Sequence, residues 1–135
     1  RMAVMLNTGA MIKLGEAEKG IDDLKKLVAH LAKTENQGLE YERFRAFRLL
    51  AKAQCHSNQF RAAKKNLVTA ENILIHRNKP SETKKLAQIQ AVLGLLITEY
   101  RQKEKRQAYV DAAERTLSKD EIETLAKKFA VDFER

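Results

Sequence analysis

Apolar residues recur along this chain at the three- and four-residue spacings that mark one face of an α-helix. Two segments show the pattern most clearly: Ile21, Leu24, Leu27, Val28 and Leu31, and further on Phe60, Ala63, Leu67, Ala70 and Leu74. No stretch sustains the alternation of apolar and polar residues that a half-buried strand needs. The pattern therefore predicts an all-α protein.

Residues that end helices divide the pattern into six or seven helices. Gly15 is expected to end the first, and the loop at 34–38 to end the second. Ser118 and Glu121 form a Ser-x-x-Glu capping box that predicts the start of the last. The expected helices cover residues 2–14, 16 to the loop at 34–38, 39–56, 59–76, from Pro80 to about 101, 108–117 and 119–133.

A helix-turn-helix signature recurs at a spacing of about 43 residues. Small residues in the pattern let two helices approach, and large residues one turn away hold the pair together. The third copy matches at Leu93 and Gly94 and then slips by about two residues, toward Ala108 and Ala112. The clearest copy comprises Phe47, Leu50, Ala51, Asn58, Phe60, Ala63, Leu67 and Ala70; the first contains Thr8, Gly15, Ala17, Gly20, Leu24 and Leu27.

This signature resembles the tetratricopeptide repeat (TPR), in a long-period variant of about 43 residues. The family's usual Pro after the second helix is absent, and Ile75 stands there. The resemblance implies antiparallel helical hairpins stacked as a TPR-like α-solenoid. A generic antiparallel bundle is the alternative. The implied units cover residues 1–38, 39–79 and 80–117, followed by a capping helix at 118–135.

Length and composition predict one domain over residues 1–135, since the chain has 135 residues. Its first residue is Arg1, so we expect a fragment of a longer chain. A single cysteine excludes a disulfide framework and favours an intracellular, cytoplasmic setting, with the nucleus as another possibility. No run approaches the roughly 20 apolar residues of a membrane span.

Catalytic and metal-binding patterns are absent from the sequence. The three histidines, His30, His56 and His76, stand far apart and lack the spacing of metal ligands. Cys55 and His56 are neighbours and would point about 100° apart on a helix, so they cannot form a nucleophile–base pair. We expect a buried or half-buried cysteine, no enzyme activity, no metal and no cofactor.

Charge is distributed unevenly. The net charge of +8 arises entirely within residues 44–86, where ten Lys and Arg residues face only Glu71 and Glu82. Such a local excess indicates an acidic partner. A solvated helix face is the alternative.

Three of these cations, Arg45, Arg48 and Lys52, share one face of the helix expected at 39–56. The resemblance implies that this face lines a concave groove, with small or apolar walls. The sequence thus predicts a basic groove that binds another protein or an acidic peptide. The alternative is that these cations face solvent or pair with Glu40, Glu42 or Glu99. The expected wall positions are Met2, Met5 and Gly9 on one side and Gln88, Ala91 and Leu95 on the other.

A secondary basic patch is expected on the outer side of the next helix and around Pro80. It would allow nucleic-acid backbone binding, although no aromatic residue is interleaved with the cations of 61–85. Two further possibilities are a structural segment that packs on folded partners and a homo-oligomer, or packing against neighbouring repeats. The patch comprises Arg61, Lys64, Lys65, Arg77, Lys79, Lys84 and Lys85.

Overall fold

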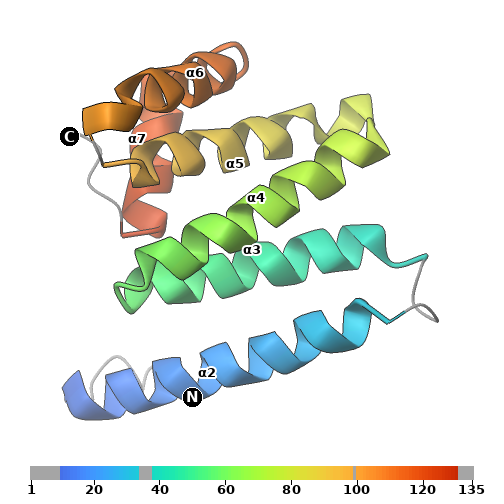
Figure 1. Cartoon of the computed structure of the whole chain (residues 1–135), viewed down its shortest axis with the longest axis vertical. Helices are drawn as coiled ribbons and strands as arrows, with labels where there is room; N and C mark the ends of the chain where they lie inside the picture. Colours follow the sequence, from blue (N-terminus) through green and yellow to red (C-terminus); the bar gives the residue numbers. More distant parts are fainter. Residues whose placement is uncertain (1–9, 34–37, 99, 131–135) are drawn as a thin grey trace.

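The computed structural model describes residues 10–33, 38–98 and 100–130, and every regular element within them is a helix. Successive helices α2 to α6 run back and forth in a stack, while α7 crosses them near α5 and α6 (Figure 1). The predicted all-α architecture of antiparallel hairpins is confirmed. The α-helices are α2 (Ala10–Leu31), α3 (Glu40–His56), α4 (Phe60–Arg77), α5 (Thr83–Leu96), α6 (Lys103–Glu114) and α7 (Lys119–Lys128); the short 3-10 helices η2 (Pro80–Glu82) and η3 (Tyr100–Gln102) precede α5 and α6.

Gly15 does not end a helix, because α2 continues through it from Ala10 to Leu31. A helical glycine costs only about 1 kcal/mol relative to alanine. The surrounding helix formers outweigh that cost, so the predicted break is wrong. Residues 2–9 of the expected first helix lie outside the described residues, as does most of the loop expected at 34–38.

The last three helices differ from their predicted bounds. α5 ends at Leu96 instead of about residue 101. α6 begins at Lys103 instead of residue 108, and α7 ends at Lys128 instead of residue 133. The start of α7 is confirmed by the capping box. The Ser118 Oγ accepts from the Glu121 N–H at 3.2 Å, and a Glu121 carboxylate oxygen accepts from the Ser118 N–H at 3.0 Å. α7 stops where Ala130 adopts a left-handed φ of 53°.

Two asparagines shape the turns around α4. Asn58, in the turn between α3 and α4, has a φ of 61°, and Asn78, which ends α4, has a φ of 49°. Asparagine tolerates this left-handed region better than most residues. Pro80 then begins η2, where its missing N–H is no loss.

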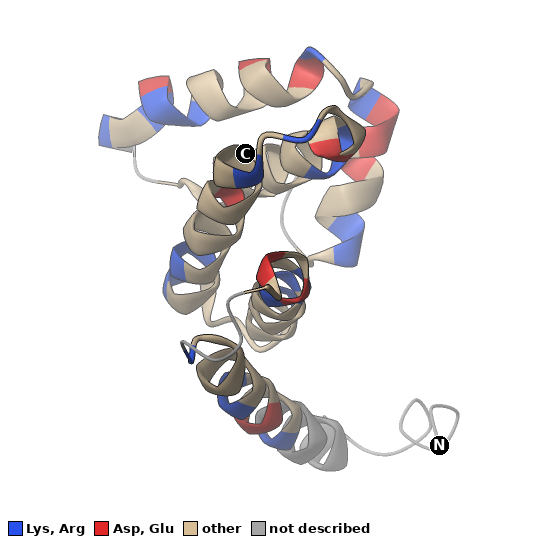
Figure 2. Ribbon diagram, turned by 90° about the vertical axis from the view of Figure 1, so that its right-hand side faces the viewer, with Lys and Arg blue, Asp and Glu red and all other residues tan. Residues whose placement is uncertain are grey.

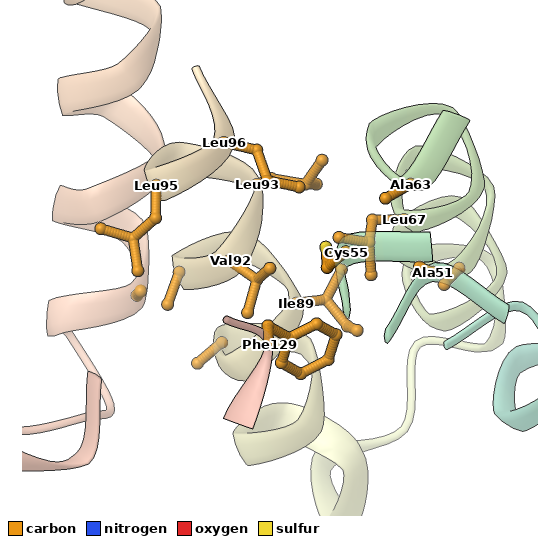
Figure 3. Close-up of a cluster of buried hydrophobic side chains, with 14 of the residues drawn as sticks. Ala51, Cys55, Ala63, Leu67, Ile89, Val92, Leu93, Leu95, Leu96 and Phe129 are labelled. Atoms are coloured by element: carbon orange, nitrogen blue, oxygen red, sulfur yellow. The ribbon is translucent and has the colours of Figure 1, made fainter. Parts of the chain in front are cut away.

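The core lies where α3, α4 and α5 meet. Ala51, Ala63 and Leu67 are fully buried there. Figure 3 shows that Ile89 of α5 lies close to Cys55 of α3 and to Phe129, the residue that follows α7. α5 is the most enclosed helix, with every residue from 91 to 97 buried. It packs against α4, α6 and α7, which explains why its sequence is uncharged over 86–98.

α5 and α6 approach closely at Gly94. A Cβ atom on Gly94 would lie 3.1 Å from both the Tyr109 Cβ and the Val110 Cγ2. One position of the 43-residue spacing recurs in α6, since Ala113 follows Ala70 by that interval and both are 0% exposed. Of the two positions toward which the third copy is expected to slip, Ala108 is exposed and Ala112 is partly buried. The slip of two residues stays a prediction.

Arg106 interrupts this pattern of small residues. It stands 43 residues after Ala63, where the pattern requires a small residue. Its guanidinium instead donates to the carbonyl oxygens of Gly94 and Ile97, at 3.2 and 3.0 Å. Arg106 thus supplies side-chain donors to carbonyl groups at the C-terminal end of α5.

Candidate functional site

A hollow of about 250 Å³ opens between α3, α5 and α7. It combines cationic and apolar side chains in one concave surface, which we name the α3–α7 hollow. α3 and α7 supply its cations, and α5 forms part of its floor. Its lining residues are Arg48, Leu49, Lys52, Gln88, Ile89, Leu125, Lys128 and Phe129.

The cations reach this hollow from distant parts of the chain. Arg48 and Lys52 are four residues apart on α3 and therefore lie on one helix face. Lys128 comes from the last turn of α7, whose Ile122, Ala126 and Phe129 are buried in the core. The His56 Nε2 lies 2.7 Å from the carbonyl oxygen of Lys128, to which it donates. This hydrogen bond fixes the end of α7 beside α3.

Arg48 is partly withdrawn from water and stacks on an aromatic ring. Its guanidinium carbon lies 4.9 Å from the centre of the Phe44 ring, a cation–π geometry. Burial lowers the pKa of Arg48, Tyr41 opposes that effect and Arg45 adds to it. Arginine nevertheless stays protonated at neutral pH. Arg48 is thus a positioned, fully charged donor at the edge of the hollow.

The charges of Arg48, Lys52 and Lys128 are uncompensated within the described residues, where no carboxylate lies within 4.0 Å of any of them. The expected alternative pairing with Glu40 or Glu42 is therefore not formed. Glu99 lies outside the described residues. Three like charges beside one hollow favour an anionic group over a neutral one.

Apolar side chains form the rest of the α3–α7 hollow. Leu49 is 48% exposed, Leu125 is partly buried, and Phe129 is buried beneath them. An exposed leucine beside unpaired cations offers both a hydrophobic and an electrostatic contact. The hollow can therefore hold an apolar side chain and an acidic group at the same time.

Two of the three predicted groove residues line the α3–α7 hollow, and the third does not. Arg48 and Lys52 line the hollow, whereas Arg45 is exposed and does not. Among the predicted wall positions, Gln88 lines it, but Ala91 and Leu95 are buried in the core. Met2, Met5 and Gly9 lie outside the described residues.

Lys128 was missed by sequence reasoning, because nothing local indicates that α7 folds back onto α3. The only local signal is the amphipathic pattern of Ile122, Leu125 and Phe129, which shows that α7 packs on something. The pattern does not show which helix α7 packs against.

Two members of the predicted secondary patch make ion pairs. The Arg77 guanidinium donates to both carboxylate oxygens of Glu82, the shorter contact being 2.8 Å, and lies 5.3 Å from the centre of the Tyr41 ring. These hydrogen bonds lower the pKa of Glu82. Lys84 pairs with Glu121 at 3.1 Å. Arg77 and Lys84 therefore have carboxylate partners within the described residues.

The remaining patch residues divide between two regions. Lys79 is exposed and Lys85 partly buried near the turn at Pro80, while Arg61 is exposed on α4. Lys64 and Lys65 line a second hollow, of about 120 Å³, together with Lys105 and Tyr109 of α6. We name it the α4–α6 hollow.

The segments that supply the cations of the two hollows lie on opposite sides of the stack. In Figure 2 the basic segment of α4 and the first turn of α6 are on one side, and the end of α7 is on the other. The sequence alone assigns both cation sets to neighbouring helices. The separation of the two cation sets follows from how the helices pack in three dimensions.

Cys55 is fully buried, as predicted, and burial raises the pKa of its thiol to about 12. The thiol is therefore protonated at neutral pH and a poor nucleophile. His30, His56 and His76 are exposed. Within the described ranges no three His, Cys, Asp or Glu side chains come together in a way that could hold a metal ion.

Replacing Glu71 by Gln is expected to raise the melting temperature at neutral pH. Glu71 is buried, and burial raises its pKa, although hydrogen bonding from Gln90 and the charge of Lys105 oppose this effect. The ionised carboxylate is therefore disfavoured in the folded state at pH values above its raised pKa. Gln removes that charge and keeps an oxygen for Gln90, whose Nε2 donates at 3.3 Å.

The pH dependence checks this prediction. The unfolded-state pKa is near 4.5, so wild type recovers stability as the pH falls from above the raised pKa toward 4.5. Thermal unfolding of both proteins should show the advantage of Glu71→Gln at neutral pH and its loss below pH 4.5. A difference that stays constant over this range would contradict the assignment.

Comparison with known proteins gives no relative: no family model, no curated protein and no solved structure matches this chain. None of the described helices has both the length and the hydrophobicity needed to cross a membrane. The α3–α7 hollow and the α4–α6 hollow are two features from which a function can be argued.

Proposed function

We propose that this chain is a non-enzymatic protein-interaction module that binds an acidic, partly apolar peptide segment in the α3–α7 hollow. One observation carries the proposal. Arg48, Lys52 and Lys128 converge there without carboxylate partners among the described residues, beside the exposed Leu49.

The chemistry of the hollow suits such a peptide. Arg48 offers the planar fork that binds a carboxylate through two hydrogen bonds. The lysines add charge without fixed geometry, and Leu49 and Leu125 provide contact for an apolar side chain. At about 250 Å³ the hollow suits one or two side chains of a segment that continues along the surface.

The stack of helices supports a TPR-like solenoid as the scaffold. α3 with α4 and α5 with α6 form the two most extensively packed helix pairs. The first helices of these pairs, α3 and α5, both contribute to the α3–α7 hollow. A buried, unpaired cysteine agrees with an intracellular setting.

A second function, as a structural segment that packs on folded partners, is favoured by the outer face of α2. Leu27 is 42% exposed there, and Leu24 and Val28 are only partly buried. Such a face suits contact with a further helix pair.

The proposal is tested by selecting binders from a peptide-display library on the immobilised protein and measuring their affinities by fluorescence anisotropy. The enriched peptides are expected to combine Asp or Glu with Leu, Ile or Phe. Lys52→Glu/Lys128→Glu should weaken their binding at least about tenfold, since close charge pairs at an interface contribute more than 1.4 kcal/mol.

Lys25→Glu/Lys26→Glu is the matched control, because both side chains are exposed on α2 and the change in net charge is the same. It should alter the affinity by less than about twofold. The proposal is wrong if no peptide is enriched, if the enriched peptides lack acidic residues, or if the two double variants weaken binding equally.

A further inference from the structure

The α4–α6 hollow brings together cations and an aromatic ring that the sequence separates. Lys64 and Lys65 come from α4, while Lys105 and Tyr109 come from α6. Val68 and the buried Leu93 and Ile97 form the apolar surface between them. The cationic run at 61–85 contains no aromatic residue, but the fold supplies one.

The lysines of this hollow are available for an anionic ligand. Among the described residues, no carboxylate lies within 4.0 Å of Lys64, Lys65 or Lys105. The carboxyl group of Glu71 interacts with Lys105 at longer range and is itself buried. Arg61 adds a further exposed cation one turn away on α4. The region is therefore positively charged overall.

The hollow is smaller than a typical site for a small molecule. Sites for small ligands are typically about 300–1,000 Å³, whereas this hollow measures about 120 Å³. It can enclose one flat group of a longer ligand, while the cations around it contact the ligand's repeated charges.

The chemistry favours nucleic acid over a membrane or a peptide. Leu93 and Ile97 lie at the bottom of the hollow and cannot insert into a lipid layer. The cations that line it are all lysines, which act as point charges on phosphate and lack the arginine fork suited to carboxylates. A partly buried tyrosine beside them offers a surface for stacking a base.

We propose that the α4–α6 hollow binds single-stranded nucleic acid, with one base against Tyr109 and the flanking phosphates at Lys64, Lys65 and Lys105. The segments that supply its lysines, in α4 and the first turn of α6, lie on the other side of the stack from the end of α7 (Figure 2). Recognition rests on the backbone and on base stacking, so it is tolerant of sequence.

The test measures binding of fluorescein-labelled oligothymidylate and oligouridylate of about 15 nucleotides, the upper range of a single binding module. Fluorescence anisotropy is followed between about 50 and 200 mM salt. Lys64→Gln/Lys65→Gln/Lys105→Gln is expected to weaken binding at least about tenfold and to reduce the salt slope by about 2, which corresponds to three lost phosphate contacts.

Tyr109→Leu separates stacking from charge. It should weaken binding about tenfold without changing the salt slope, because it removes the ring and no charge. Tyr109→Phe keeps the ring and should bind within about twofold of wild type. Thermal unfolding of each variant shows whether the fold is retained, and the triple lysine variant tests the site if Tyr109→Leu does not fold.

Lys19→Gln/Lys25→Gln/Lys26→Gln removes the same charge from exposed positions of α2 and should change binding by less than about twofold. The proposal is overturned if wild type binds neither oligonucleotide or if this control loses as much affinity as the hollow variant. It is also overturned if Tyr109→Leu binds like wild type, or if only phosphatidylserine-containing vesicles are bound.

Discussion

Gly94→Leu is expected to lower the free energy of unfolding by about 3 kcal/mol, because overpacking of a tight helix contact has costs of this size. A Cβ atom at this position would already lie 3.1 Å from the Tyr109 Cβ and 3.2 Å from the carbonyl oxygen of Arg106. The carbonyl belongs to the α6 backbone, so a larger side chain must separate α5 from α6. Urea unfolding followed by circular dichroism measures the change.

Gly20→Ala is the comparison at an unobstructed helical glycine. Gly20 also lies within a helix, but a Cβ atom there would have nothing within 4 Å. Alanine should therefore stabilise the protein by about 0.5–1 kcal/mol through its higher helix propensity. Equal effects at both glycines would show that α5 and α6 do not approach as closely as described.

Leu67→Ala is expected to destabilise the protein by about 3 kcal/mol, within the range for a leucine removed from a packed core. Leu67 is fully buried in the core cluster, together with Ala51 of α3 and Ile89 of α5 (Figure 3). Its loss leaves a cavity where three helices meet. Urea unfolding should show a lower midpoint with an unchanged dependence on denaturant.

Ile75→Ala serves as the comparison on the same helix. Ile75 is 52% exposed, so truncating it should change the stability by no more than about 0.5 kcal/mol. A large loss at Ile75, or a small one at Leu67, would contradict the assignment of the buried face of α4.

Helices with local start and stop signals were predictable from the sequence. α3 and α4 begin and end within one residue of their expected bounds, because the turn at Asn58 and the left-handed Asn78 are local features. The capping box at Ser118 placed the start of α7 for the same reason. The buried face of α4 also follows from spacing alone.

Gly15 and Arg106 show where local reasoning fails. Glycine is a residue that commonly ends helices, but Gly15 lies inside α2. Its helical conformation is determined by the helix formers on either side. Arg106 breaks the expected pattern of small residues, yet its guanidinium contacts carbonyl groups that belong to α5. That function depends on a partner helix and leaves no signal in its own segment.

The sequence by itself determined the all-α class, most helix positions and the excess of positive charge in residues 44–86, because spacing, capping and composition are local properties. The tertiary structure alone decided which cations meet. It used Arg77 and Lys84 in ion pairs, placed Lys128 beside Arg48 and Lys52, and brought Tyr109 and Lys105 to Lys64 and Lys65. These arrangements depend on how α6 and α7 pack against the stack, and packing between distant segments is set by the shape of the whole core.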